Sequence, residues 1–254
     1  MAILLPWVQY TAGISLFAGD ALLSSLYLSG LLAAIFVGYA FSCQGVGQRA
    51  LGLMGLMHCL WFAAMVSAAI GLTQWLNLQD SLGMYILQTD IGDRAKGNLG
   101  QPNQLATLLL MGMAAFAYVY EQRLIGRFAF FLGIAFMTMV LILTQSRAGM
   151  LSVLLVTVFL IWKKRTVELR LSTNAVAWWA ICFFIGTLFL PYLSEALLLG
   201  DVRGVTSTEA ISQRWRMWQQ VAYAVAQSPW VGYGWNQTPT AHAAGAVAFP
   251  GDFT

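Results

Sequence analysis

The chain has 254 residues, of which 59% are hydrophobic and only 9% are charged. A soluble globular domain carries roughly 25% charged residues, so this chain has too few charges to cover a water-facing surface. The composition excludes a soluble enzyme and predicts an integral membrane protein. The net charge of +3 is too small to indicate a nucleic-acid partner.

Long apolar runs predict the membrane helices. Crossing a bilayer takes about 20 mostly apolar residues. We expect an all-α, polytopic protein with about seven transmembrane helices, at residues 3–18, 21–41, 50–76, 105–120, 128–144, 148–162 and 175–193. The first run is interrupted by polar residues and could instead be an interfacial segment. The 148–162 run is short, which leaves open a single long hairpin around Ser146 and Arg147.

Loop charges predict the orientation, because Lys and Arg in short loops prefer the cytoplasm. The basic loops at 42–49, 121–127 and 163–174 are therefore expected inside, and 77–104, 145–147 and 194–254 outside. Residues 1–193 would form a transmembrane bundle, and residues 194–254 an outer loop with an amphipathic helix. The chain ends in that loop with no following span, so we expect a partial sequence.

Metal and disulfide signals are weak. Cys43, Cys59 and Cys182 are scattered, which argues against a disulfide framework and a zinc site. The close outward carboxylates Asp90 and Asp93 have no histidine partner. We therefore expect no metal and no cofactor.

The first polar constellation is the stretch "RAKGNLGQPNQLAT", residues 94–107. Asn103 stands where an N-cap belongs, ahead of the apolar run at 105–120. The helix N-terminus would face outwards with its positive dipole end, and Arg94 and Lys96 lie just upstream, so the pattern favours an anion site. A capped helix entry with a solvated loop would also explain Asn103, but it explains Gln101 and Gln104 less well.

The second constellation is "TQSRAG", residues 144–149. Arg147 lies between two apolar runs, where a cation is costly unless it is paired, reaches the interface or lines a wet cavity. Ser146 beside it would help to hold a ligand oxygen. A snorkelling arginine in a turn is the alternative.

The third constellation, residues 212–237, predicts an amphipathic helix ended by Ser228 and Pro229. It should lie on the outer surface against membrane lipid, with aromatic residues such as Trp218 at headgroup level. For the tryptophans, a plain interfacial helix is the favoured interpretation. Arg214 and Arg216 would face lipid phosphates or a bound substrate.

Together these segments place Arg94, Arg147 and Arg214 on one face of a membrane protein that has little conventional catalytic machinery. Three outward cations suit a polyanionic lipid head group. A pyrophosphate fits best, since arginine pairs with phosphate oxygens in a bidentate way.

At these residues the sequence resembles the O-antigen ligase superfamily, and within it the pilin-type O-oligosaccharyltransferases. The resemblance rests on "GNLGQPNQLATLLLM", "LTQSRAGML" and "SQRWRMWQQVAYAVAQSPWVGYGWNQ", in this order, and covers about residues 90–254. The preference for the oligosaccharyltransferase branch depends on the Gln-Pro-Asn-Gln stretch. In the family a His-Asn pair follows in the large outer loop. This chain ends where the pair should follow, and His242 has no neighbouring Asn.

The resemblance implies transfer of a glycan from undecaprenyl pyrophosphate to an acceptor hydroxyl at the periplasmic face of the bacterial inner membrane, without a metal. The acceptor would be a protein such as pilin, or the lipid A core. On this view Arg94, Arg147 and Arg214 hold the pyrophosphate and stabilise its charge, while Gln101 and Gln104 orient the glycan or the acceptor hydroxyl.

Two alternatives remain open from the residues. An O-antigen polymerase would use the same lipid-linked donor. A transporter or flippase for a lipid-linked anion would bind the pyrophosphate without chemistry, but such proteins usually show repeats and broken helices near the midplane.

Overall fold

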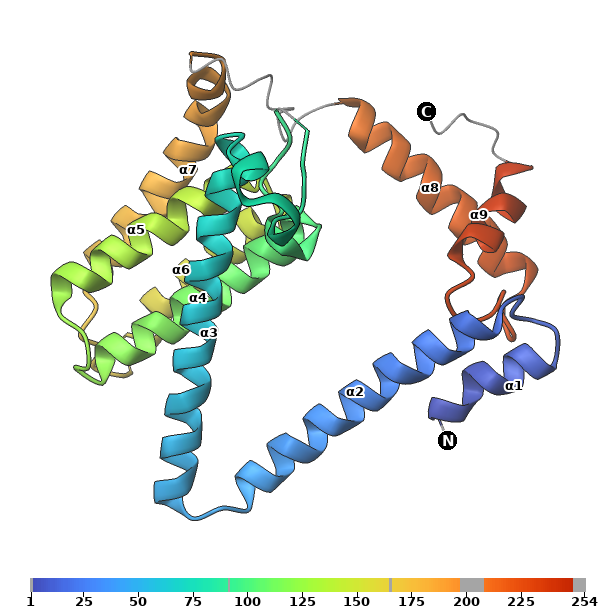
Figure 1. Cartoon of the computed structure of the whole chain (residues 1–254), viewed down its shortest axis with the longest axis horizontal. Coiled ribbons are helices and arrows are strands. Elements are labelled where there is room, and N and C mark those ends of the chain that lie inside the picture. Colours follow the sequence, from blue (N-terminus) through green and yellow to red (C-terminus); the bar gives the residue numbers. More distant parts are fainter. Residues whose placement is uncertain (1, 91, 165, 197–207, 249–254) are drawn as a thin grey trace. The chain divides into compact units, whose positions relative to one another are not determined.

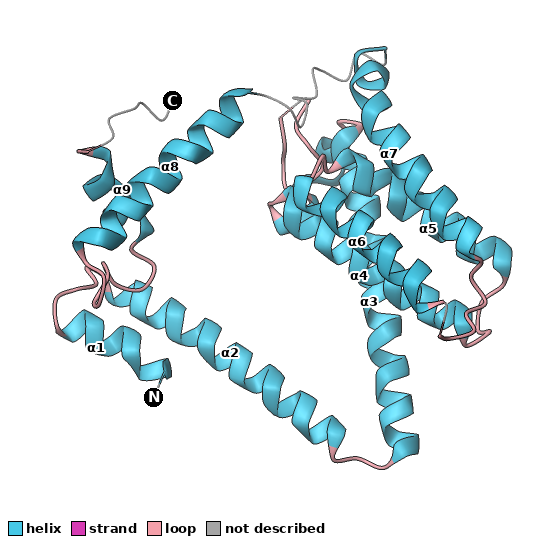
Figure 2. Ribbon diagram, turned by 180° about the vertical axis from the view of Figure 1, so that it is seen from behind, coloured by secondary structure: helices cyan, strands magenta, loops and turns pink. Residues whose placement is uncertain are grey.

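The computed structural model describes residues 2–90, 92–164, 166–196 and 208–248, with side chains for all of these except 82, 194–196 and 208–214. Most of the residues described lie in helices, and none of them lies in a strand (Figures 1 and 2). The predicted all-α class is confirmed. The chain forms two compact units: residues 1–49 together with 206–254, and residues 50–205. The predicted boundary between a bundle at 1–193 and a loop at 194–254 stays a prediction.

Within the described ranges, four helices are long and apolar enough to cross a membrane, as expected for a multi-pass membrane protein. They are α2 (Ala18–Ser42), α3 (Val46–Trp75), α4 (Pro102–Glu121) and the Thr173–Leu193 part of α7 (Thr173–Ala196). The runs at 128–144 and 148–162 also fold as helices, α5 (Arg127–Leu143) and α6 (Arg147–Lys163), but each has only 17 residues. The predicted count of seven spans is therefore not confirmed.

The predicted first span, residues 3–18, is not a continuous helix. A short 3-10 turn (Ala2–Leu4) leads into α1 (Leu5–Thr11), and Gly13 then adopts a positive φ of 74° in the turn before α2. Seven residues of helix rise only about 10 Å, whereas the hydrocarbon core is about 30 Å thick. The polar residues that interrupt this run mark the place where the chain turns.

The unit formed by residues 50–205 is built around α4. Helix α4 contacts α5 and α6, and α7 contacts the same two helices, so the four run alongside one another (Figures 1 and 2). One face of α4 is buried almost completely, through residues such as Leu105, Leu109 and Val119. Helix α3 crosses this face closely, because a side chain added at Gly112 would overlap Ala64. Small residues that let helix backbones approach are typical of packing between membrane helices.

Different loops are bonded to the helices at the two ends of this unit. At one end the amide of Ala95 donates to the carbonyl of Leu143 (3.2 Å), which joins the 77–104 loop to the end of α5. At the other end the carboxylate of Glu121 accepts hydrogen bonds from the amides of Arg170 (2.8 Å) and Leu171 (3.1 Å). The guanidinium of Arg170 also lies 4.0 Å from the centre of the Tyr120 ring. Within this unit, the loop predicted outside (77–104) therefore lies at the opposite end from the loops predicted inside (121–127 and 163–174).

The second unit combines the α1–α2 hairpin with α8 (Thr208–Gln227) and α9 (Thr238–Ala246). Helix α8 confirms the predicted amphipathic helix and ends at Gln227, directly before Ser228 and Pro229. Its Gln220 and Ala224 are buried, and Gly245 allows α9 to pack against the backbone of α8 at Gln220. Helix α9 was not expected from the sequence.

The crossing of α3 and α4 leads to a stability prediction. We expect Gly112→Ala to lower the free energy of unfolding by about 1–3 kcal/mol, because the new methyl group forces the two helices apart. The matched control is Gly55→Ala in α3, where an added side chain meets open space. It should be neutral or stabilising by up to about 1 kcal/mol. Thermal unfolding of the purified protein in detergent micelles measures both. Equal midpoints for the two variants would contradict the close crossing.

Candidate functional site

Two of the three predicted constellations meet at one end of the 50–205 unit. The hydroxyl of Ser146 donates a hydrogen bond of 2.7 Å to the side-chain oxygen of Asn103, 43 residues earlier in the chain. Ser146 also accepts a 3.0 Å hydrogen bond from the amide of Gly149 and so caps the N-terminus of α6. The contact sets the first turns of α4 and α6 side by side.

Asn103 does not cap its own helix, contrary to the sequence-based prediction. Helix α4 begins at Pro102, the residue before Asn103. Gln101 occupies the N-cap position, and its side chain makes no capping hydrogen bond. Proline is tolerated there because the first amides of a helix have no intrahelical partner. Asn103 therefore lies inside the first turn, and its amide side chain is available to Ser146. Of the hydrogen-bonded residues Asn103 and Ser146, only Ser146 caps a helix, at the N-terminus of α6.

The turn between α5 and α6 is buried. Thr144, Gln145 and Ser146 are each at most 3% exposed. Gln145 adopts a left-handed conformation (φ 45°), which is unusual for a residue other than glycine. Its side chain donates to the carbonyl of Ile142 (3.1 Å). The side chains of Gln145 and Ser146 thus bond to protein groups, while Arg147, the first residue of α6, is half-buried.

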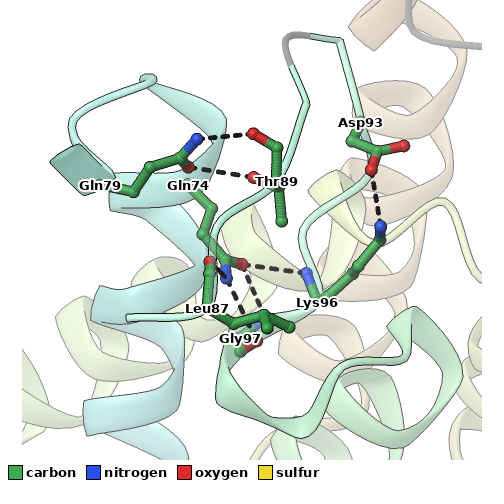
Figure 3. Close-up of polar contacts among 7 residues, drawn as sticks. All are labelled: Gln74, Gln79, Leu87, Thr89, Asp93, Lys96 and Gly97. Atoms are coloured by element: carbon green, nitrogen blue, oxygen red, sulfur yellow. Dashed lines mark hydrogen bonds and ion pairs between the residues drawn. The ribbon is translucent and has the colours of Figure 1, made fainter. Parts of the chain in front are cut away.

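A buried glutamine organises the loop before α4 (Figure 3). Gln74, near the end of α3, is 3% exposed. Its side-chain nitrogen donates to the carbonyls of Leu87 (2.9 Å) and Gly97 (3.1 Å), and its oxygen accepts from the amides of Lys96 (3.2 Å) and Gly97 (2.8 Å). One side chain therefore satisfies four backbone groups of a loop that has little regular structure of its own.

Two further amides complete this network. Gln79 and Thr89 are joined through the side-chain nitrogen of Gln79 and the Thr89 carbonyl (2.6 Å), and through the Thr89 hydroxyl and the Gln79 side-chain oxygen (3.0 Å) (Figure 3). Asn98 accepts from the amide of Leu87 (3.0 Å) and donates to the carbonyl of Tyr85 (2.8 Å). The sequence analysis did not single out these residues. Gln74 and Gln79 do carry a signal in the sequence, because each is an amide at or just beyond the end of the apolar run at 50–76.

The two cations of the loop differ in their surroundings. Lys96 forms an ion pair of 2.6 Å with Asp93, also drawn in Figure 3, and its side chain is 27% exposed. Arg94 is exposed. The pairing offsets part of the charge that Lys96 would offer to an anion, so the exposed Arg94 is the stronger candidate of the two loop cations.

A shallow groove of about 440 Å³ lies along the start of α4. Asn103, Gln104 and Thr107 supply its polar groups, and apolar residues of the same segment form the rest of its wall. Gln101 and Gln104 are exposed. The predicted amides are therefore accessible at the end of the unit where the two helix N-termini meet.

The third constellation lies in the other unit, on α8. Arg216 and Trp218 are exposed, and Trp218 retains 66% of its surface. The side chain of Arg214 is outside the described residues, so the predicted convergence of Arg94, Arg147 and Arg214 stays a prediction. His242 is half-buried on α9.

The arrangement in the 50–205 unit suits an anion. The positive ends of two helix dipoles lie together, each worth roughly 0.3–1 kcal/mol to a nearby negative charge. Arg147 adds a full charge at the same place, and the exposed glutamines add neutral donors and acceptors. Among the described residues, no cluster of three or more His, Cys, Asp or Glu side chains could hold a metal ion.

Two segments of this chain match known protein families. Residues 130–252 match the family described as "O-Antigen ligase", and residues 95–118 match that described as "Protein glycosylation ligase". The second match contains Asn103 and the first contains Ser146. The two residues joined by the hydrogen bond between α4 and α6 therefore lie in separate matched segments.

Two curated proteins of Acinetobacter baylyi are similar to this chain. A general O-oligosaccharyltransferase is 30% identical over 247 residues, covering 94% of this chain and 43% of the relative. A ComP-specific O-oligosaccharyltransferase is 26% identical over 178 residues, covering 69% of this chain and 32% of the relative. The chain thus spans less than half the length of either relative. No solved structure matches it.

The role of Gln74 can be measured directly. We expect Gln74→Met to lower the protection of residues 87–97 against hydrogen exchange at least tenfold, because a buried polar group left without a partner costs about 1–3 kcal/mol. Exchange followed by mass spectrometry on peptides from this loop gives the value. The control is Gln122→Met, at an exposed residue directly after α4. Unchanged protection in the Gln74 variant would show that the loop is held by other contacts.

Proposed function

The chain belongs to the O-antigen ligase superfamily, and we propose that it transfers a glycan from undecaprenyl pyrophosphate to an acceptor hydroxyl at the periplasmic face of the bacterial inner membrane. The observation that carries the proposal is the hydrogen bond between Ser146 and Asn103. It brings two family-matched segments together and directs the N-termini of α4 and α6 to one place. That place is where the sequence analysis expects the outer face.

In the proposed reaction the bond between the anomeric carbon of the glycan and the pyrophosphate oxygen breaks. The acceptor hydroxyl oxygen forms the new bond to that carbon, and its proton is lost to solvent or to a base. Undecaprenyl pyrophosphate leaves with additional negative charge. Groups that bind this charge more strongly as it develops lower the barrier.

The site residues divide into two roles. Arg147 binds the leaving pyrophosphate with the help of the two helix N-termini, and Arg94, Lys96 and Arg214 add positive charge. Gln101 and Gln104 orient the glycan or the acceptor hydroxyl by hydrogen bonds.

Asn103 and Ser146 act by position, since their hydrogen bond ties together the ends of the two helices, one of which begins with Arg147. Arg216 and Trp218 hold α8 at the level of the lipid head groups, where exposed aromatic and cationic side chains are stabilised.

A protein acceptor such as pilin is favoured over a lipid. Both curated relatives are named as O-oligosaccharyltransferases, and residues 95–118 match a protein glycosylation ligase. The lipid A core is the second candidate acceptor, because residues 130–252 match the O-antigen ligase family. A reconstituted assay offering both acceptors to the same donor decides between them.

The role of Arg147 can be tested by mutation. We expect Arg147→Ala to lower the rate of glycan transfer by roughly 100-fold or more, since removal of one charge-stabilising donor has this order of effect. Transfer from undecaprenyl-pyrophosphate glycan to a pilin-like acceptor in proteoliposomes is the measurement. Membrane insertion should stay unchanged.

The matched control is Arg127→Ala. Arg127 is also the first residue of a helix, but α5 begins at the opposite end of the same unit. Its loss should leave the transfer rate within a factor of about two, because charges at that distance are largely screened. Equal losses in both variants would contradict the pyrophosphate assignment.

Metal dependence gives an independent test. If arginines and helix ends balance the pyrophosphate charge, transfer should proceed at the full rate in excess EDTA, because no bound cation has to share that charge. The rate is compared before and after chelation, and again after addition of Mg²⁺ or Mn²⁺. A rate that is lost with EDTA and restored by either ion would refute metal-independent transfer.

A further inference from the structure

A second groove lies in the other unit, between the start of α2 and the segment that leads into α9. Its volume is about 420 Å³, within the range of small-molecule sites. The walls come from residues more than 200 positions apart in sequence: Leu16, Phe17 and Asp20 on one side, and residues 236–240 on the other.

Asp20 holds the two sides together. One of its carboxylate oxygens accepts from the side-chain amide of Asn236 (2.8 Å), and the other from that of Gln237 (2.6 Å). The amide of Trp235 donates to the side chain of Gln9 (3.0 Å), which docks the same segment on the α1–α2 hairpin. The groove is therefore shaped by directed, charge-assisted hydrogen bonds.

The polar groups of the groove keep capacity for both donors and acceptors. A carboxylate offers about four lone-pair positions and an amide side chain two N–H donors and one carbonyl oxygen, of which Asp20, Asn236 and Gln237 use only part among themselves. The Thr240 hydroxyl donates to the Gln237 side-chain oxygen (3.0 Å) and still has lone pairs. Such a mixed set suits hydroxyl groups, each of which donates and accepts.

The remaining wall is apolar and open. Phe17 and Leu16 are 66% and 64% exposed, and they stand beside the carboxylate at the mouth of the groove. An exposed aromatic ring next to planar polar side chains can pack against the C–H face of a sugar ring. The negative charge of Asp20 disfavours a phosphate in the same place.

The length of α2 places the groove near the head groups of the membrane. Asp20 is in the first turn of α2, whose 25 residues are long and apolar enough to cross a membrane. At 1.5 Å per residue this helix exceeds the hydrocarbon thickness of about 30 Å, so its first turn falls near the head groups. Sugars attached to a membrane lipid begin at this level.

From these observations we infer that the groove between Asp20 and residues 236–240 is a carbohydrate subsite, which binds neutral sugar residues of a membrane-anchored glycan through Asp20, Asn236, Gln237 and Thr240, with Phe17 against the ring. The inference rests on the proposed function, in that it assigns the glycan of the lipid-linked donor as the ligand. The pyrophosphate is not expected in this groove.

The test compares ligand binding by the full chain in lipid nanodiscs. The variants are Phe17→Ala and Thr240→Val, because both residues line the groove but neither anchors the docked segment as Asp20 does. The matched control is Phe36→Ala, a similarly exposed phenylalanine (64%) inside α2, the helix that Phe17 directly precedes. The probes are undecaprenyl pyrophosphate carrying an N-acetylhexosamine-containing trisaccharide, bare undecaprenyl pyrophosphate, lipid A core oligosaccharide and a pilin-derived serine peptide.

We expect both groove variants to bind the glycan-bearing lipid about fivefold more weakly or worse, as loss of one hydrogen bond or one ring contact predicts. Their affinity for the bare lipid, and the affinity of the control for every probe, should not change. A loss confined to lipid A core oligosaccharide would leave the affinity for the glycan-bearing donor lipid at its wild-type value, and it would therefore overturn the inference.

Two results would overturn the inference alone: wild-type affinity for the glycan-bearing lipid in both groove variants, or a loss limited to the serine peptide. Failure of the wild-type chain to bind either undecaprenyl lipid would instead overturn the proposed function, and this inference with it.

Discussion

The hydrogen bond from the Ser146 hydroxyl to the Asn103 side chain is the interaction on which the proposed site depends. It joins the first turns of α4 and α6, so that two helix N-termini and Arg147 lie at one end of the 50–205 unit. Helix ends near a membrane surface need partners for their unpaired amides. Here Ser146 satisfies one of them and also ties its helix to the neighbouring one, and the positive dipole ends remain together.

In the loop before α4, one polar side chain likewise satisfies several backbone groups. Gln74 lies at the end of an apolar helix, where a buried amide would be costly without partners. It satisfies four backbone groups at once and so replaces the regular hydrogen bonding that this loop lacks. Gln74 thereby holds the backbone of Lys96, and Arg94 lies two residues earlier in the same loop.

In the other unit a single carboxylate has a comparable role. Asp20 joins the start of a membrane-spanning helix to the segment that enters α9. The N-terminal hairpin, which lies outside both family-matched segments, thereby becomes part of a groove with the C-terminal part of the chain. Each unit has a distinct polar site, one suited to an anion and one suited to hydroxyl groups.

The sequence alone determined the membrane class, the helical fold, most helix positions and the opposite placement of the loops around α4–α7. These follow from the length and charge of continuous segments, and such local properties do not depend on partners far along the chain. It failed where the outcome depended on a distant partner. Asn103 was predicted to cap its own helix but bonds to Ser146 instead, and Gln74 and Asp20 were overlooked because their partners lie 13–23 and more than 200 residues away. Only the tertiary structure decides such pairings, because a hydrogen bond requires two groups within about 3 Å, and sequence spacing does not specify that distance across separate helices.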